Sequence, residues 1–523
     1  MTETQAWTPR VNPWIIALTV TLATFMEVLD TSIANVALPH IAGGLSAGED
    51  EATWVLTSYL VSNAIVLPLS GWLSNVFGRK RFYMTCVAVF TVSSFLCGLA
   101  PNLSFLIFLR ILQGMGGGGL QPSEQAILAD TFPPAKRGMA FAFYGFAVVA
   151  APAIGPTLGG WITDNYTWRW IFLINVPIGI LSLFLTSRLV EDPPYLRGRS
   201  RAGIKIDYVG FALLVVGLGL LQVVMDKGQR QDWFESNFIV ISTIVSLTCL
   251  IAVVIWELRQ KDPIVDFGLL RERNFGTASF MMFMLGLVLF GSTVLLPQLM
   301  QTLLGYSAKD AGMAISPGGF VIMACMPLVG YLVSRMDARL LIAFGLAVTS
   351  WALYHMSNFS LNMNFGTLAY ARVYQAMGIA FLFVPINTVA YAFMPPNKSN
   401  AVSALINLGR NVGGSVGISF VTFLLARRTQ VHQSMMIGNL NPYNDHFRQA
   451  LQGTTHAFAA AGSSPSTASA QAYAQLYGVV QRQSAMLAYI DCFSILAIIF
   501  GALIPFVFIM KKVQPHKGAP PAH

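Results

Sequence analysis

Long runs of apolar residues dominate this chain and are separated by shorter polar stretches. A helix crosses the hydrocarbon core of a bilayer with about 20 apolar residues, at about 1.5 Å of rise per residue. Most of the runs reach that length, so the pattern predicts fourteen membrane-spanning helices. They lie at about 13–37, 52–74, 82–100, 103–127, 138–163, 169–190, 206–225, 236–256, 275–303, 310–334, 338–357, 366–394, 399–425 and 485–510.

The first apolar run contains two acidic residues, Glu27 and Asp30, in otherwise apolar surroundings. Residues three apart project from the same face of a helix. A carboxylate near the middle of a bilayer costs about 3 kcal/mol on insertion scales, so such residues usually face a polar cavity. The pair therefore predicts an ion-coupled transport pathway. The alternative is a pair of acids that protonation or a partner helix neutralises, and that serves packing only.

Composition supports a membrane protein and argues against other classes. The chain is 55% hydrophobic and 11% charged, with a mean hydropathy of +0.60, whereas soluble domains are about 25% charged. The net charge is +9, but the basic residues lie in short connections, which argues against nucleic-acid binding. The five cysteines lack metal or redox spacing, and the seven histidines are scattered. We therefore expect no metal, no cofactor and no catalytic residues.

The basic residues also predict the orientation of the chain. An even number of spans places both termini on one side of the membrane. Lys and Arg gather in alternate connections, for example at 79–81, 136–137, 197–205 and 259–273. Cytoplasmic loops carry an excess of Lys and Arg, so both termini are expected in the cytoplasm.

An internal repeat predicts two related halves. The stretch from Arg110 to Gly116 recurs from Arg372 to Gly378, and Pro133-Pro134 recurs as Pro395-Pro396, both at an offset of 262 residues. The offset spans eight segments, which fits two six-helix bundles with two helices inserted between them. Equivalent helices then run in the same direction, and a substrate site is expected between the halves. The predicted domains are 1–190, the inserted pair with its flanking loops at 191–257, and 258–523.

One connection differs from the others in length. Residues 426–484 are polar, rich in Ala, Ser, Thr and Gln, and lie on the non-cytoplasmic side of the predicted topology. A connection of this length is either a disordered linker or a working surface, and the sequence leaves both open.

Five stretches in order resemble the fourteen-helix drug:proton antiporters of the major facilitator superfamily, specifically the EmrB-like multidrug efflux subfamily. The resemblance covers essentially the whole chain. The first stretch is Leu29–Pro39 in the first helix, and the second is Gly71–Arg81 between helices two and three, which includes Gly71, Asn75, Gly78 and Arg79. The third is Arg110–Gly114 in helix four. The fourth is the antiporter motif of helix five, with Gly155, Pro156, Gly159 and Gly160, and the fifth is Trp168–Pro177 at helix six.

The loop motif departs from the family pattern at Asn75, where the family normally carries an acid that helps close the cytoplasmic side. Asparagine forms hydrogen bonds but carries no charge. Either the gate is looser in this chain, or its arginines pair elsewhere.

Depth in the membrane predicts a contact between Asp30 and Arg110. The first and fourth helices run in opposite directions, and the two residues lie at matched depths. An acid beside a fixed arginine keeps its charge, whereas an acid in an apolar cavity takes up a proton more readily. Glu27 is then the proton carrier and Asp30 orients Arg110, although the resemblance favours Asp30 as the recurrent acid. A structural bond from Arg110 to the backbone of the first helix is the alternative.

Further polar residues complete the candidate site. Gln113 and Gln375 add neutral polar groups, and Arg372 occupies the place of Arg110 in the second half, as a remnant of duplication or as a substrate contact. Glu124 is expected in water near the cytoplasmic end of helix four, with a role at the rim of the gate. Asp491 is expected at the start of the last helix, in a capping or snorkelling role.

Together these features predict a proton-driven exporter of hydrophobic small molecules, not an enzyme. The resemblance implies an inner-membrane pump that joins an EmrA-like periplasmic adaptor and a TolC-like outer-membrane channel, with 426–484 or the inserted pair as the docking surface. A dedicated exporter of one metabolite or siderophore shares the architecture. A membrane-embedded lipid-linked transferase is the alternative of another class, and the chain lacks the polar cluster it requires.

Overall fold

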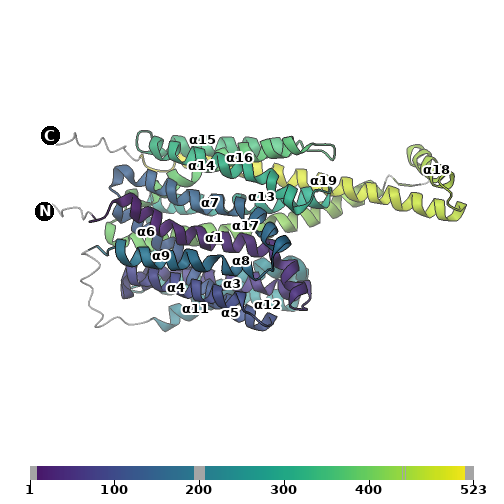
Figure 1. Ribbon diagram of the computed structural model, residues 1–523. Helices are drawn as coiled ribbons and strands as arrows, with labels where there is room; N and C mark the ends of the chain where they lie inside the picture. The colour runs from purple at the N-terminus through teal and green to yellow at the C-terminus, as the bar shows by residue number, and fades with distance from the viewer. Residues whose placement is uncertain (1–8, 194–206, 439, 442, 513–523) are drawn as a thin grey trace.

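The computed structural model describes residues 9–193, 207–438, 440–441 and 443–512, and over this part of the chain it is built from helices. The long helices lie side by side in one bundle (Figure 1). Helix α1 (Pro13–Gly44) begins at the same end of the bundle at which α19 (Pro465–Val507) ends, and we call this end the terminal end. We call the opposite end the arm end, because α17 (Ser399–Ile437) ends and α19 begins on that side.

The first part of the chain forms the helices up to residue 189. They are α1 (Pro13–Gly44), α2 (Glu49–Ala52), α3 (Trp54–Phe77), α4 (Arg79–Gly98), α5 (Leu103–Gly117), α6 (Leu120–Thr131), α7 (Pro134–Asn165), α8 (Trp170–Leu173) and α9 (Asn175–Leu189). We refer to them as the first half.

The two helices that follow, α11 (Tyr208–Lys227) and α12 (Asn237–Glu257), pack on each other, and α11 also packs on α3 and α17. Short 3-10 turns at Gly228–Gln231, Trp233–Glu235, Phe267–Arg271 and Pro396–Lys398 occupy connections. The second half comprises α13 (Arg273–Thr302), α14 (Ala308–Val333), α15 (Ala338–Met356), α16 (Phe365–Ala392), α17 (Ser399–Ile437), α18 (Asp445–Ala460) and α19 (Pro465–Val507).

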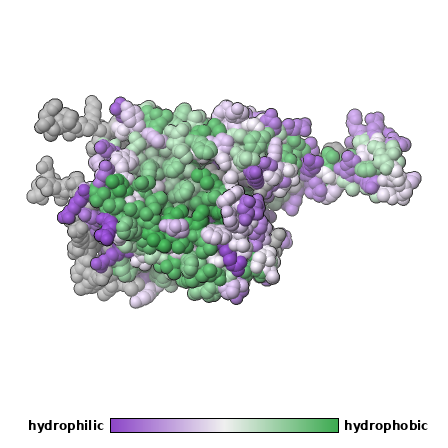
Figure 2. Space-filling view, in the orientation of Figure 1, coloured by the Kyte–Doolittle hydropathy of each residue, from purple (hydrophilic) through white to green (hydrophobic). Residues whose placement is uncertain are grey.

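Among the described residues, thirteen helices are long and apolar enough to cross a membrane. The bent helix α7 adds one more when its two pieces, Pro134–Pro152 and Ile154–Asn165, are taken as one span. Figure 2 shows a hydrophobic belt across the visible face of the bundle, with hydrophilic residues at both ends. The predicted all-α membrane fold is confirmed.

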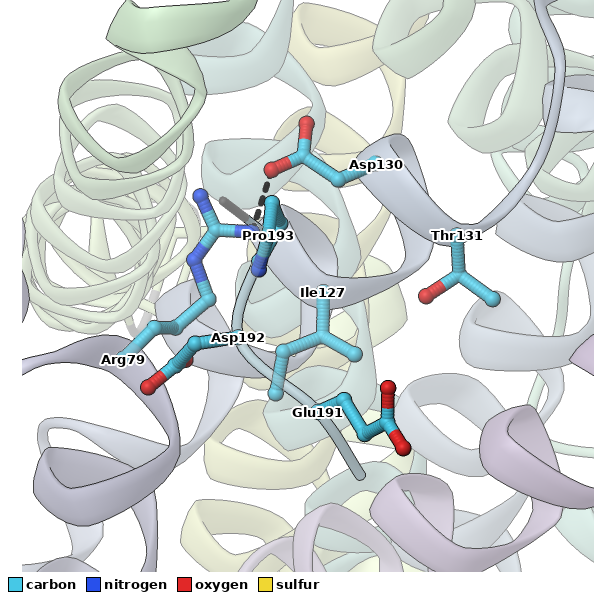
Figure 3. A pocket seen from close by; sticks show the side chains of 7 residues that line it. All are labelled: Arg79, Ile127, Asp130, Thr131, Glu191, Asp192 and Pro193. Carbon is cyan, nitrogen blue, oxygen red and sulfur yellow. Dashed lines mark hydrogen bonds and ion pairs between the residues drawn. The ribbon is translucent and has the colours of Figure 1, made fainter. Parts of the chain in front are cut away.

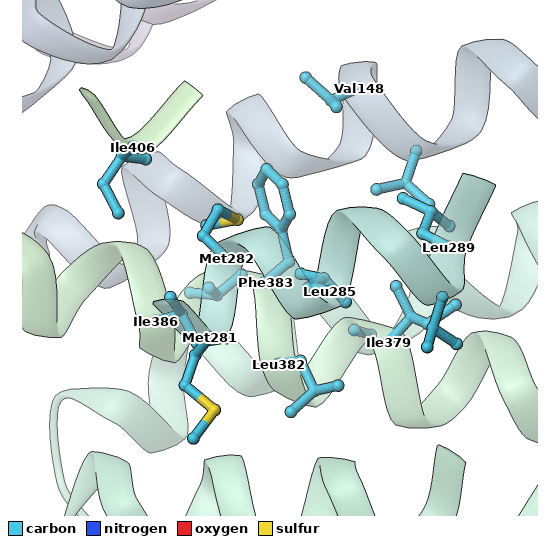
Figure 4. Close-up of a cluster of buried hydrophobic side chains, with 14 of the residues drawn as sticks. Val148, Met281, Met282, Leu285, Leu289, Ile379, Leu382, Phe383, Ile386 and Ile406 are labelled. Atoms are coloured by element: carbon cyan, nitrogen blue, oxygen red, sulfur yellow. The ribbon is translucent and has the colours of Figure 1, made fainter. Parts of the chain in front are cut away.

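Apolar side chains from both halves join in one core. Figure 4 shows Val148 of α7 beside Met282 and Leu285 of α13 and Phe383 of α16. All four are buried members of the same cluster. Apolar packing thus continues across the boundary between the halves, and the polar contacts described below are set within it.

Two predicted single helices are interrupted. The run at 103–127 forms α5 and α6, which are separated at Gly118 and Gly119. A Cβ atom at Gly118 would lie 3.0 Å from the Val66 side chain and closer still to the Asn63 carbonyl, so the glycines allow a close approach to α3. The run at 169–190 likewise forms α8 and α9.

The linker interpretation of 426–484 is wrong over the described residues. Helix α17 continues to Ile437, α18 follows, and α19 already begins at Pro465, where Ser464 caps its first turn. The two long helices project beyond the bundle and carry α18 at the far end (Figure 1). We call residues 426–484 the arm. Low hydropathy suggested a loop, but the Ala and Gln that fill the segment are strong helix formers.

Candidate functional site

An ion pair joins α1 to α5 inside the first half. Arg110 Nη1 lies 2.6 Å from Asp30 Oδ2, and both side chains are almost fully buried. The other carboxylate oxygen of Asp30 accepts hydrogen bonds from Gln113 Nε2 at 3.0 Å and Asn175 Nδ2 at 2.7 Å. The contact expected from matched depth is present, and Asp30 is held by one cation and two amides.

Arg110 is also tied to α3. Its Nε donates to the Val55 carbonyl at 3.0 Å, and its guanidinium carbon lies 4.2 Å from the centre of the Tyr59 ring. The backbone bond considered as an alternative role therefore exists, but on α3 instead of α1. One arginine thus connects three helices of the first half.

Glu27 lies one helical turn from Asp30, nearer the terminal end, and its surroundings differ. It accepts hydrogen bonds from Tyr59 Oη at 3.0 Å, Asn63 Nδ2 at 3.1 Å and Gln121 Nε2 at 2.6 Å. The side chain is buried, and all three of these donors are neutral. A carboxylate whose hydrogen-bond donors are all neutral can take up a proton without breaking a direct ion pair. This is the chemical difference between the two acids of α1.

The second half repeats part of this arrangement without the acid. Arg372 Nη1 donates to Gln375 Oε1 at 2.7 Å, as Arg110 Nη1 does to Gln113 Oε1 at 2.8 Å. Gln375 Nε2 then donates to Ser292 Oγ at 2.7 Å, where Gln113 donates to Asp30. Arg372 is therefore a buried cation whose hydrogen-bond partners among the described residues are neutral.

A third polar cluster connects the halves and was not predicted from the sequence. Arg410 of α17 donates to Gln121 Oε1 and, at 3.3 Å, to Tyr144 Oη of α7. Nearby, Asn407 Nδ2 donates to Gln125 Oε1 at 2.7 Å. An arginine within an apolar segment was the available signal for this cluster, but its partners in the first half lie more than 250 residues away in the sequence.

The loop motif lies at the terminal end, against the start of α17. Arg79 pairs with Asp130 of α6 (Figure 3), and its Nε donates to Asn400 Oδ1 at 2.7 Å. Asn400 Nδ2 donates to Asn75 Oδ1 at 2.8 Å. A Cβ atom at Gly71 would lie 3.0 Å from the Asn400 carbonyl oxygen. Both motif side chains thus meet the other half at one asparagine.

The departure at Asn75 is explained by these contacts. Asp130, at the end of α6, supplies the carboxylate that pairs with Arg79, so the arginine is not left unpaired. Gly78 ends α3 with φ of +88°, a conformation that favours glycine. The loop therefore keeps a tight turn and a charge pair, with the acid contributed by a different helix.

The antiporter motif packs α7 against α1. A Cβ atom at Gly155 would come within 3.0 Å of the Ser32 side chain, and one at Gly159 would lie 3.0 Å from Ile33. Pro156 lies within α7 between them. At Gly160, by contrast, no atom of the described residues lies within 4 Å of such a Cβ. The motif therefore has one tight face and one open face.

The expected position of Glu124 is wrong. It is fully buried, and Thr21 Oγ1 donates to its Oε1 at 2.5 Å. Its Oε2 has no hydrogen-bond partner among the described residues. Helix α6 continues to Thr131, so Glu124 lies about 10 Å of helix rise from the terminal end of that helix.

The expected position of Asp491 is also wrong. It lies well inside α19 instead of starting a helix, because α19 begins at Pro465. Its Oδ2 lies 2.8 Å from His432 Nε2 and 3.3 Å from Arg428 Nε, both on α17. Asp491 therefore joins the two long helices at the base of the arm.

An apolar cavity of about 280 Å³ lies between α7 and α14, near the start of α1. Trp14, Phe143, Met323 and Met326 are among its lining residues. Met326 and Phe383 both flank Gly145, and the guanidinium carbon of Arg410 lies 6.0 Å from the centre of the Phe383 ring. The cavity thus ends close to the cluster that connects the halves.

Two repeated helical halves with buried charges between their spans are the architecture of a secondary transporter. The sequence model of the Major Facilitator Superfamily matches residues 20–418. The chain belongs to this superfamily and is a multi-pass membrane transporter.

The relatives refine this assignment. The chain is 41% identical over 431 residues to the multidrug export protein EmrB of Haemophilus influenzae, covering 82% of this chain and 84% of the relative. It is 37% identical over 498 residues to the fatty acid resistance protein FarB of Neisseria gonorrhoeae, covering 95% and 96%. The resemblance to the EmrB-like subfamily is confirmed.

Solved structures share the fold at low sequence identity. The proton:xylose symporter XylE aligns with a TM-score of 0.59 at 15% identity, covering 96% of this chain and 97% of the symporter. The human organic anion transporter MFSD10 aligns with a TM-score of 0.58 at 13% identity, covering 94% and 100%. At such identities the similarity concerns the fold alone.

Proposed function

We propose that the chain exports hydrophobic small molecules across the inner membrane in exchange for protons. The observation that carries this proposal is the pair of acids on α1. Asp30 is fixed by Arg110, whereas Glu27 is buried among neutral donors at hydrogen-bond distance. In this proposal Glu27 takes up the proton and Asp30 keeps Arg110 in position.

Alternating access follows from the contacts between the halves. With both termini in the cytoplasm, the terminal end is the cytoplasmic end. The contacts of Asn400 with Arg79 and Asn75 keep this end closed, and the cluster around Arg410 continues the contact towards the middle of the membrane. Proton uptake from the outside favours separation of these contacts, and substrate then enters from the cytoplasm or the inner leaflet. The EmrB relative is named a multidrug export protein, which supports export of several drugs by this chain.

The arm is the proposed docking surface for an EmrA-like periplasmic adaptor, which in turn joins a TolC-like outer-membrane channel. It projects beyond the hydrophobic belt of the bundle (Figures 1 and 2). Exposed apolar side chains lie near its tip, among them Tyr443 at 94% and Met435 at 65% exposure. The inserted helices α11 and α12 are the second candidate surface.

An exporter dedicated to one metabolite, such as an acidic amphiphile, is the second candidate function. Arg372 favours it because this buried cation contacts Gln375 and Thr293 but no acid among the described residues. An anionic substrate headgroup would supply the missing charge. The fatty acid resistance protein FarB, at 37% identity, is consistent with this substrate class.

The test is drug-evoked proton movement in liposomes that contain the purified protein, with Asp30→Asn measured alongside. We expect several unrelated hydrophobic compounds to evoke proton flux in the wild type and none to do so in Asp30→Asn. Flux with one carboxylate-bearing compound alone would favour the dedicated exporter. Transport that ignores the proton gradient would contradict proton coupling.

A further inference from the structure

We propose that Gln121 transmits the protonation state of Glu27 to Arg410, and so links proton uptake to the contact between the halves. This inference rests on the proposed function and names the residue that performs the coupling. Gln121 belongs to α6, the short helix that follows the interruption at Gly118 and Gly119.

One amide group contacts both halves. Gln121 Nε2 donates to Glu27 Oε2 at 2.6 Å, on α1 of the first half. Its Oε1 accepts from Arg410 Nη2, on α17 of the second half. The amide cannot serve both partners in the opposite orientation, because its NH₂ would then face the donors of Arg410 and its oxygen would face a carboxylate. An ionised Glu27 therefore fixes the amide in the orientation that Arg410 requires.

Arg410 depends on this contact because its other partners are weak. It is almost fully buried, and its remaining hydrogen bonds go to Tyr144 Oη at 3.3 Å and Asn411 Oδ1 at 3.4 Å. Its Nε has no partner among the described residues. A buried cation without an acid at hydrogen-bond distance is costly, and the charge of Glu27 beyond Gln121 reduces that cost.

Protonation of Glu27 removes this support. A hydrogen bond to a carboxylate is about twice as strong as one between neutral groups, so Glu27 holds the amide less firmly when its charge is lost. Tyr144 still donates to Gln121 Oε1 at 3.3 Å, but Arg410 then has a less firmly held acceptor and loses the negative charge of Glu27. Separation of α17 from α6, which returns Arg410 to a more polar environment, becomes favourable. The direction is correct for a proton antiporter, in which proton uptake precedes opening towards the cytoplasm.

Tyr59 donates to Glu27 itself, whereas the neighbouring charged groups of the first half are held by different partners. Asp30 and Arg110 bind each other, and Glu124 binds Thr21. The groups that face Glu27 or share its electrostatic environment are Tyr59 of α3, Arg110 of α5, Glu124 of α6, Tyr144 of α7, Arg410 of α17 and Asp30 of α1 itself. Among the described residues, Gln121 is the side chain that hydrogen-bonds to both Glu27 and Arg410.

Gln125 provides a matched control. It lies one turn further along α6 and also contacts the second half, through Asn387 at 3.0 Å and Asn407 at 2.7 Å. It makes no hydrogen bond to Glu27. Replacement of Gln125 therefore weakens the same interface without affecting the proposed link to the proton site.

The experiment measures the separation of the terminal ends by pulsed electron paramagnetic resonance at pH values from about 5 to 8. Spin labels are attached to the full chain in lipid nanodiscs at Arg81→Cys and Met336→Cys, exposed positions in opposite halves. The partly exposed Cys249 and Cys325 are replaced by serine. Wild type, Gln121→Leu, Gln125→Leu and Arg410→Gln are compared, and drug-evoked proton flux is measured in parallel.

We expect the wild-type distance distribution to widen as pH falls. Gln121→Leu and Arg410→Gln should give one distribution at all pH values and lose proton flux by more than tenfold. Gln125→Leu should shift the distribution at every pH but keep its pH response. A pH response in Gln121→Leu equal to that of the wild type, or none in the wild type, would overturn the inference. If the wild type responds to pH but gives no drug-evoked flux, the proposed function fails while the role of Gln121 stands.

Discussion

Gln125 of α6 donates a hydrogen bond to Asn387 of α16 at 3.0 Å, and the two residues are separated by the same 262 positions that separate Arg110 from Arg372. Equivalent positions of two repeats meet only near the axis that relates them. The contact therefore marks where the pseudo-twofold axis passes between the halves. It agrees with the parallel repeat that the sequence predicts.

The repeat is asymmetric at the positions that we propose for proton transfer. At the same offset, Glu27 corresponds to Leu289, Asp30 to Ser292, Gln121 to Phe383 and Glu124 to Ile386. The second half therefore retains the arginine and glutamine but none of these acids. The proposed proton site therefore lies in the first half, and the second half contributes Arg410 to the contact between the halves.

The two acids of α1 should respond differently to neutralisation. Asp30→Asn leaves Arg110 buried without its charge partner, and loss of one member of a buried pair costs about 3–5 kcal/mol. Glu27→Gln breaks no direct ion pair, and Arg410 is expected to move to a more polar environment when the charge is lost, so the cost of this substitution should be below about 1.5 kcal/mol. Both variants should lose drug-evoked proton flux. Thermal unfolding in detergent checks the difference, with a clearly lower midpoint expected for Asp30→Asn alone.

Two controls make this comparison decisive. Asp30→Asn combined with Arg110→Gln removes both charges and should recover part of the lost stability without recovering flux. Proton-driven efflux retained by both Glu27→Gln and Asp30→Asn would contradict the assignment of these residues.

Gly155 and Gly160 test whether the antiporter motif acts by close helix packing. Gly155→Ala introduces a methyl group within 3.0 Å of the Ser32 side chain, whereas Gly160→Ala meets no atom of the described residues within 4 Å. Overpacking costs about 1–3 kcal/mol, so Gly155→Ala should lower both the unfolding midpoint and the transport rate. Gly160→Ala should resemble the wild type in both measurements. Equal effects of the two substitutions would show that packing on α1 is not the role of the motif.

Much of the fold could be predicted from the sequence because hydropathy indicates directly how long each membrane-spanning segment is and which residues avoid water. Fourteen apolar runs and one repeat offset defined a bundle of two related halves. Hydropathy does not distinguish a continuous helix from one interrupted at Gly118 and Gly119, since glycine is not polar enough to end an apolar run. Nor does it distinguish a polar helix from a loop, which explains the error over the arm.

The candidate site was predictable within one half and not between halves. The contact of Asp30 with Arg110 followed from helix direction and depth, two quantities that the topology supplies. The predicted positions of Glu124 and Asp491 were wrong because the predicted helix ends were wrong. Helix α6 ends at Thr131 and α19 begins at Pro465, so both acids lie inside their helices and away from the helix ends. The pairing of Gln121 with Arg410 depends on how the halves pack, and no local pattern encodes it.

The arm gives a prediction about assembly that is separate from transport chemistry. It is joined to the bundle by α17 and α19, and Asp491 links these helices through His432 and Arg428. Helix α18 packs on α19, with the Phe447 and Tyr473 ring centroids 6.3 Å apart, and has no buried residue of its own. Replacing 438–464 with a flexible Gly-Ser linker of equal length should therefore leave the bundle folded.

We expect this replacement to reduce co-purification of an EmrA-like adaptor at least tenfold, while the pump stays in the membrane and transports drug in liposomes. The matched control is Asp491→Asn, which weakens a partly exposed ion pair and should cost less than about 1 kcal/mol. That variant should keep its adaptor, because it leaves the tip intact. Unchanged adaptor yield after the replacement would exclude α18 as the docking surface and favour the inserted pair α11 and α12. Loss of drug transport in liposomes would instead show that the arm supports the bundle itself.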